Sequence, residues 1–166
     1  SLYDRCITIG LPGSMMPMIY GNAYRITQSP GYVAIQYEMV HEARIIPLND
    51  SPRVASNLDF YMGDARGRWE GDTLVVDVTS FNDQTWFDRA GNFHSEALHV
   101  VERYTRTGPD HLIYEATIED PKVFTRPWTI RMPLYRRLEE GKRILEYKCV
   151  EFVEQLMYGH LGVIDP

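Results

Sequence analysis

The chain has 166 residues, a formal net charge of −6, 44% hydrophobic residues and 24% charged residues. The length allows a single domain with a sizeable core, and the composition is typical of a folded globular chain rather than a disordered one. An acidic chain without a basic run is a poor nucleic-acid binder, and no apolar stretch reaches the ~18 residues that a membrane-spanning helix requires. We therefore predict one domain over residues 1–166, with no nucleic-acid partner and no membrane span.

Short extended segments separated by turn residues fill the first part of the chain. Residues 22–28 predict a strand, and Pro30 marks the turn that follows it. Residues 32–39 alternate between an apolar and a polar face, which is typical of a half-buried strand. Residues 44–48 predict a further short strand that Pro47 ends.

Three hairpins are predicted in the second part of the chain. They cover residues 67–79, residues 98–106 with 111–119, and residues 128–138 with 143–153. Residues 95–104 and 150–158 also fit helices, and we favour strands at both places. The sum is an all-β fold of about eight or nine antiparallel strands with one or two short helices. Such a meander either curls into a barrel or buries one face in a sandwich, and we expect a lipocalin-like barrel or a strongly curled sheet.

Four segments lie outside this pattern: an extended N-terminal segment (1–21), two long loops (49–65 and 80–97) and a C-terminal tail (154–166). Loops of this length within a compact domain are often binding loops or lids. The loop 80–97 is rich in aromatic residues. It either packs as a plug over one end of the sheet or forms the mouth of a ligand cavity.

The two cysteines, Cys6 and Cys149, lie near opposite ends of the chain. They are either joined or two unrelated buried thiols, and we favour the disulfide. It would close a loop of about 143 residues and contribute roughly 5 kcal/mol in the chain-entropy model. A disulfide indicates an oxidising, extracytoplasmic compartment, either periplasmic or secreted. The chain begins at Ser1 without a leader, so we expect it to be a piece of a longer or processed protein.

Several motifs resemble those of a family of exported proteins that is abundant in soil bacteria and has no assigned activity. They are Cys-Ile-Thr-Ile-Gly-Leu-Pro-Gly at 6–13, Arg-Trp-Glu-Gly-Asp-Thr-Leu-Val-Val-Asp at 68–77, Leu-His-Val-Val-Glu-Arg-Tyr at 98–104, Glu-Asp-Pro at 119–121 and Arg-Pro-Trp at 126–128. The resemblance covers nearly the whole chain. It implies export, a lipocalin-like barrel and a further N-terminal segment in the natural protein. It assigns no catalytic residue.

Strand alternation directs a few ionisable side chains toward the interior. Glu102 shares the inward face of its strand with Tyr104, and His41 continues the apolar face of residues 32–39. A carboxylic acid and an imidazole in an apolar cavity could act as general acid and base, with His99 as an alternative base. The competing interpretation is a buried ion pair, such as a Glu102–Arg salt bridge that holds the strands in register.

A ligand cavity in such a fold would be lined by aromatic side chains and a few polar groups. We predict this lining to include Tyr37, Tyr104, Tyr114, Trp86, Trp128 and Arg44. His94, Glu96 and His99 lack the spacing of a known metal motif, so we expect no metal, and we expect no organic cofactor.

Three functions remain open at this level. The first is a small-molecule-binding barrel for an apolar or aromatic ligand. The second is a cofactor-independent lyase, isomerase or hydrolase that uses the Glu102 and His41 pair. The third is an interaction subunit of a larger exported assembly or a homo-oligomer, which docks through the methionine-rich segment Met15–Met18 or the C-terminal tail.

Overall fold

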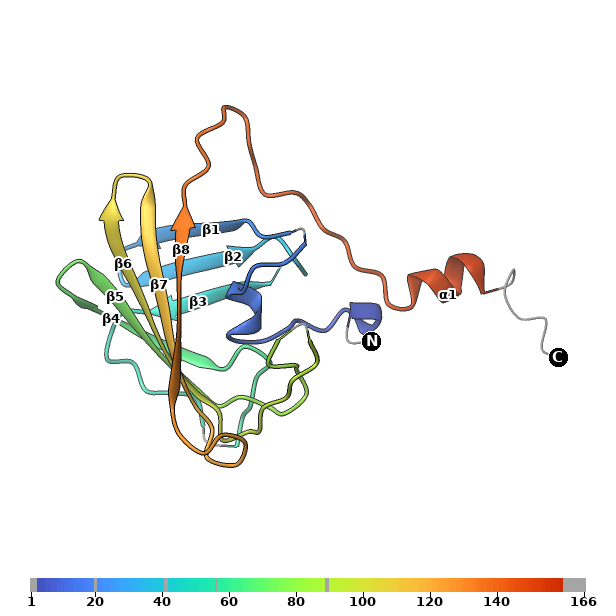
Figure 1. Cartoon of the computed structure of the whole chain (residues 1–166), viewed down its shortest axis with the longest axis horizontal. Helices are drawn as coiled ribbons and strands as arrows, with labels where there is room; N and C mark the ends of the chain where they lie inside the picture. Colours follow the sequence, from blue (N-terminus) through green and yellow to red (C-terminus); the bar gives the residue numbers. More distant parts are fainter. Residues whose placement is uncertain (1–2, 20, 41, 56, 89, 160–166) are drawn as a thin grey trace.

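The computed structural model describes residues 3–19, 21–40, 42–55, 57–88 and 90–159, which form an all-β fold of antiparallel strands (Figure 1). The strands are β1 (Tyr24–Ser29), β2 (Tyr32–Tyr37), β3 (Ala43–Pro47), β4 (Asp64–Glu70), β5 (Thr73–Thr79), β6 (His99–Gly108), β7 (His111–Glu119) and β8 (Trp128–Tyr135). Two short 3-10 helices, η1 (Tyr3–Arg5) and η2 (Gly13–Met15), precede them, and the helix α1 (Val153–Tyr158) follows. The predicted antiparallel meander is thus confirmed.

The described strands belong to two separate sheets and do not close into a barrel. β1, β2 and β3 form a three-stranded sheet, and β4 to β8 form a five-stranded one. In Figure 1 the small sheet lies across the strands of the large one. The sheets meet at β3 and β4 through side chains: a Cβ at Gly67 would lie 2.8 Å from Ile46 Cγ2 and 2.7 Å from Leu48 Cδ2. The sandwich alternative therefore describes this fold better than the expected barrel.

The core lies between the inner faces of the two sheets. In β2 the alternation predicted from sequence is observed, since Val33, Ile35 and Tyr37 are buried. In the large sheet, the cross-strand pairs Val76–Glu102 and Val78–Val100 lie on the inner face. Period-two patterning therefore assigned these faces correctly.

The loop after β5 packs inward as a plug. Phe81 and Phe87 are buried, and the Thr85 hydroxyl bonds to His94 Nε2 at 2.8 Å within the interior. Gly10 in the N-terminal segment packs against Thr85, so the plug and this segment cover the same end of the core.

The methionine-rich segment, predicted as a docking site, is partly buried in the core. Met15 is fully buried and belongs to the core cluster, and Met16 packs against that cluster. Tyr24 donates a hydrogen bond to the Met15 carbonyl at 3.0 Å. The thioether side chain of Met15 fills core space, as methionine commonly does.

The predicted strand over residues 143–153 is wrong. β8 ends at Tyr135, and residues 136–159 form an exposed extension, which we call the C-terminal arm (Figure 1). Its last part is α1, so the helical alternative for residues 150–158 is partly observed. The predicted disulfide between Cys6 and Cys149 is present and attaches the arm to the N-terminal segment. Phe152 N also donates to the Asp4 carbonyl at 2.7 Å. Among the described residues, no helix has the length and apolar character needed to cross a membrane.

Candidate functional site

A buried ion pair joins the two sheets at the centre of the core. Arg44 on β3 donates to Glu102 on β6 through Nη1 to Oε1 at 3.2 Å and through Nη2 to Oε2 at 2.6 Å. Glu102 has no exposed surface and Arg44 is 5% exposed. This is the Glu–Arg salt bridge that the sequence offered as one alternative, and it connects sheets rather than neighbouring strands.

Three tyrosines complete the hydrogen bonding of this pair. Tyr104 and Tyr114 donate to Glu102 Oε1 at 2.9 and 3.0 Å, and the Tyr37 hydroxyl accepts from Arg44 Nη1 at 3.1 Å. Arg44 Nε is the one buried side-chain polar atom without a hydrogen-bond partner in the described part of the chain. A buried charge is costly unless it is paired and hydrogen-bonded. In this cluster the two charges are paired, and nearly every polar side-chain atom has a hydrogen-bond partner.

Burial and charge together set the ionisation of this cluster. Burial acts to lower the pKa of Arg44, but the charge and hydrogen bond of Glu102 together with Tyr37 and Tyr104 outweigh it, so the pKa of Arg44 lies well above its ordinary value. Burial raises the pKa of Tyr37 to about 12, and burial followed by the Glu102 charge raises those of Tyr104 and Tyr114 well above the ordinary value. The guanidinium therefore stays charged and the three phenols stay protonated.

Among the described residues proposed for acid–base chemistry, Glu102 and His99 lie apart. His41 lies outside the described residues. His99 lies on the opposite face of β6 from Glu102, where its Nε2 contacts Asp77 Oδ2 at 2.9 Å. An odd spacing along a strand directs two side chains to opposite faces, so the Glu102–His99 combination cannot form a dyad. Acid–base catalysis by Glu102 and His41 stays an untested prediction.

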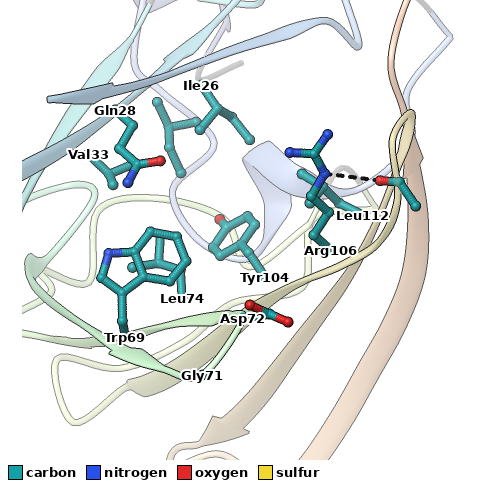
Figure 2. A pocket seen from close by; sticks show the side chains of 12 residues that line it. Ile26, Gln28, Val33, Trp69, Gly71, Asp72, Leu74, Tyr104, Arg106 and Leu112 are labelled. Carbon is teal, nitrogen blue, oxygen red and sulfur yellow. Dashed lines mark hydrogen bonds between the residues drawn. The ribbon is translucent and has the colours of Figure 1, made fainter.

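An open cleft lies between the two sheets, beside the ion-pair cluster (Figure 2). It has a volume of about 730 Å³. Its walls are apolar side chains from both sheets, namely Ile26, Val33, Ile35, Leu74 and Leu112. Gln28, Asp72 and Arg106 supply polar groups.

Two aromatic rings define this cleft. Trp69, which is 47% exposed, faces the cleft from the end of β4 opposite Ile26 and Gln28 of β1 (Figure 2). Tyr104 lies between the walls, and its hydroxyl bonds to the buried Glu102. The Tyr104 ring is thus held in a fixed position by the ion-pair cluster.

Of the six residues predicted to line a cavity, Tyr104 is the one that lines this cleft. Tyr37 and Tyr114 are buried beside Glu102, and Arg44 lines a smaller hollow of about 320 Å³ near β3 and β4. The backbone of Trp86 forms an isolated antiparallel bridge with that of Phe93 in the plug.

Trp128 packs against Phe87 and Phe124, at 5.5 Å between ring centroids in each pair. It is therefore part of the plugged end of the core and not of the cleft. Sequence reasoning missed Trp69, although it shares the inward face of β4 with Ala65 and Gly67. The alternation of inward and outward residues along this strand was the sequence signal that could have identified Trp69.

The histidine near the second long loop forms no metal site. His94 is buried and hydrogen-bonded to Thr85 and to the Ser95 carbonyl. Across the described residues, no group of three histidine, cysteine, aspartate or glutamate side chains could hold a metal ion.

Comparison of the chain with protein-family models, with curated proteins and with solved structures gives no match.

Proposed function

We propose that the protein binds a small apolar or aromatic molecule in the cleft between its two sheets. The observation that carries this proposal is Trp69, a large ring half exposed at the mouth of a cleft with apolar walls. Exposing an aromatic surface of this kind to water costs free energy. A ligand that covers the ring removes this cost. A mostly apolar cleft with a few polar groups is the usual form of a small-molecule site.

Binding of the neutral fluorescent probe N-phenylnaphthylamine tests this proposal. The probe should bind saturably and receive excitation energy from tryptophan. Trp69→Ala should weaken its affinity at least about tenfold, since it removes one wall of the cleft. Tyr32→Ala is the matched control, because Tyr32 has a similar exposure of 44% outside the cleft. Absence of saturable binding, or equal affinities of the two variants, contradicts the proposal.

An extracytoplasmic location is part of the proposal. The Cys6–Cys149 disulfide supports it, because structural disulfides persist mainly in oxidising compartments.

A second candidate function is self-association, in which the C-terminal arm docks onto a second copy of this chain. Leu145, Leu156 and Met157 on this arm are 73%, 69% and 55% exposed, and exposed apolar surface can mark an interaction site. Light scattering over a range of concentrations should then show self-association that Leu156→Glu abolishes. Ile45→Glu, on the exposed face of β3, should leave it unchanged. A single monomer mass at all concentrations excludes self-association through the arm.

A further inference from the structure

The inter-sheet cleft continues toward the opposite end of β1. A second hollow of about 890 Å³ lies between β1, β8 and the start of the C-terminal arm. A smaller one of about 400 Å³ lies between the two and shares Arg106 and Leu112 with the first and Leu134 and Arg136 with the second. Ile26 lines all three. The hollows therefore form one groove along the inner face of β1.

The two ends of this groove differ in charge. The end near Trp69 holds one acidic and one basic side chain, Asp72 and Arg106. The far end holds five cations, and no acidic side chain is among the described residues that line it. These cations are Arg25, Arg136, Arg137, Lys142 and Arg143. The chain as a whole carries a net charge of −6, so this accumulation runs against its composition.

Most of these cations lack an internal counter-charge. Arg136 lies 3.8 Å from Asp110. The other four have no ion-pair partner within the part of the chain that the structure describes. Unpaired cations around a hollow raise the local positive potential and attract an anionic group. Arginine is well suited to a carboxylate, because its planar donors can bind both oxygens.

The basic end also has apolar lining. Tyr24, Ile26, Met132, Leu134 and Ile144 line it together with the cations. An occupant must therefore be apolar along its length and charged at one end. From Gln28 to Arg25 the strand β1 rises by about 10 Å, at roughly 3.3 Å per residue. A decyl chain covers a distance of this order.

We infer that the ligand of this groove is an anionic amphiphile, a single aliphatic chain that ends in a carboxylate. Its tail lies against Trp69 and Tyr104 in the cleft, and its carboxylate lies between Arg137 and Arg143 at the far end. This inference rests on the proposed function of the cleft and adds the chemical class and the orientation of the ligand.

Parallel titrations with decanoate and decanol, followed by tryptophan fluorescence, test the inference. The two molecules share the tail and differ in the charged head. Decanoate should bind at least about tenfold more tightly, and its affinity should fall as salt is added, because surface charge interactions are screened. The affinity for decanol should not depend on salt.

The variant Arg137→Gln/Arg143→Gln should bring the decanoate affinity down to that of decanol. The control Arg126→Gln/Arg131→Gln removes the same charge from exposed positions outside the groove and should keep the preference. Equal binding of both molecules by the native protein, or a preference that survives in the groove variant, overturns the inference and leaves the proposed function intact. Failure of both molecules to bind contradicts the proposed function as well.

Discussion

At the scale of single residues, the Arg44–Glu102 pair decides how the interior is held together. Removal of one partner leaves a buried charge without compensation, which typically costs about 3–5 kcal/mol. Glu102→Gln and Arg44→Met should each lower the free energy of unfolding by about this amount in urea titrations. The double variant Arg44→Met/Glu102→Met should cost less than either single one, because it removes both charges. Additive losses would show that the two side chains do not act as a pair.

The buried tyrosines make the fold sensitive to alkali. The pKa values of Tyr24 and Tyr37 are raised to about 12 by burial, while an unfolded chain ionises tyrosine near pH 10. A pKa that is higher in the folded state means that stability is complete below pH 10 and is lost as the pH rises toward 12.

In a pH titration followed by phenolate absorbance, some of the 11 tyrosines should therefore ionise only at high pH. Their ionisation should coincide with unfolding. Tyr37→Phe should reduce this late change by one phenol. Ionisation of all 11 in an early step, with the fold retained, would disprove the assignment.

At the scale of elements, the approach to β4 depends on Gly63. Its φ is +68°, and a Cβ there would lie 2.6 Å from Val78 Cγ1 and 2.8 Å from the Thr79 carbonyl oxygen. Gly63→Ala should destabilise the fold by about 2–4 kcal/mol, through backbone strain and overpacking. Gly31 has a φ of +79° with open space around it, so Gly31→Ala should show the strain alone, about 1 kcal/mol. Thermal unfolding of both variants separates the two contributions, and equal losses would contradict the steric argument.

Sequence patterning correctly predicted the strands that pair with a strand next to them in the sequence. Alternation placed Glu102 and Tyr104 inward because the hairpin β6–β7 fixes their register locally. The same residue types at 143–153 predicted a strand that does not form, because β8 ends at Tyr135 and no neighbour supplies a ladder. The cleft could not be predicted in this way. It lies between β1 and β2 of the small sheet and β4 to β7 of the large sheet, and its shape depends on how the two sheets pack.

At the scale of the whole molecule, the disulfide mainly positions the C-terminal arm. The chain-entropy model assigns about 5 kcal/mol to a loop of this length, but it assumes that both ends are fixed in the folded protein without the bond. Cys149 lies on the arm, whose described residues are mostly exposed. We therefore expect Cys6→Ser/Cys149→Ser to lower the free energy of unfolding by much less than 5 kcal/mol.

Two measurements check this prediction. Urea unfolding should show the small loss, and limited proteolysis should remove the arm faster from the variant than from the native protein. A loss near 5 kcal/mol would show that the arm is held in place by the rest of the fold.

The bond between Cys6 and Cys149 also turns residues 6–149 into a covalent ring that contains all eight described strands. A protease that nicks a single exposed loop, for example within residues 49–55, opens this ring without releasing a fragment. The two pieces should still migrate as one species until a reductant is added. In a protease-rich environment outside the cell, such a circular chain would tolerate a first cut and keep both sheets together.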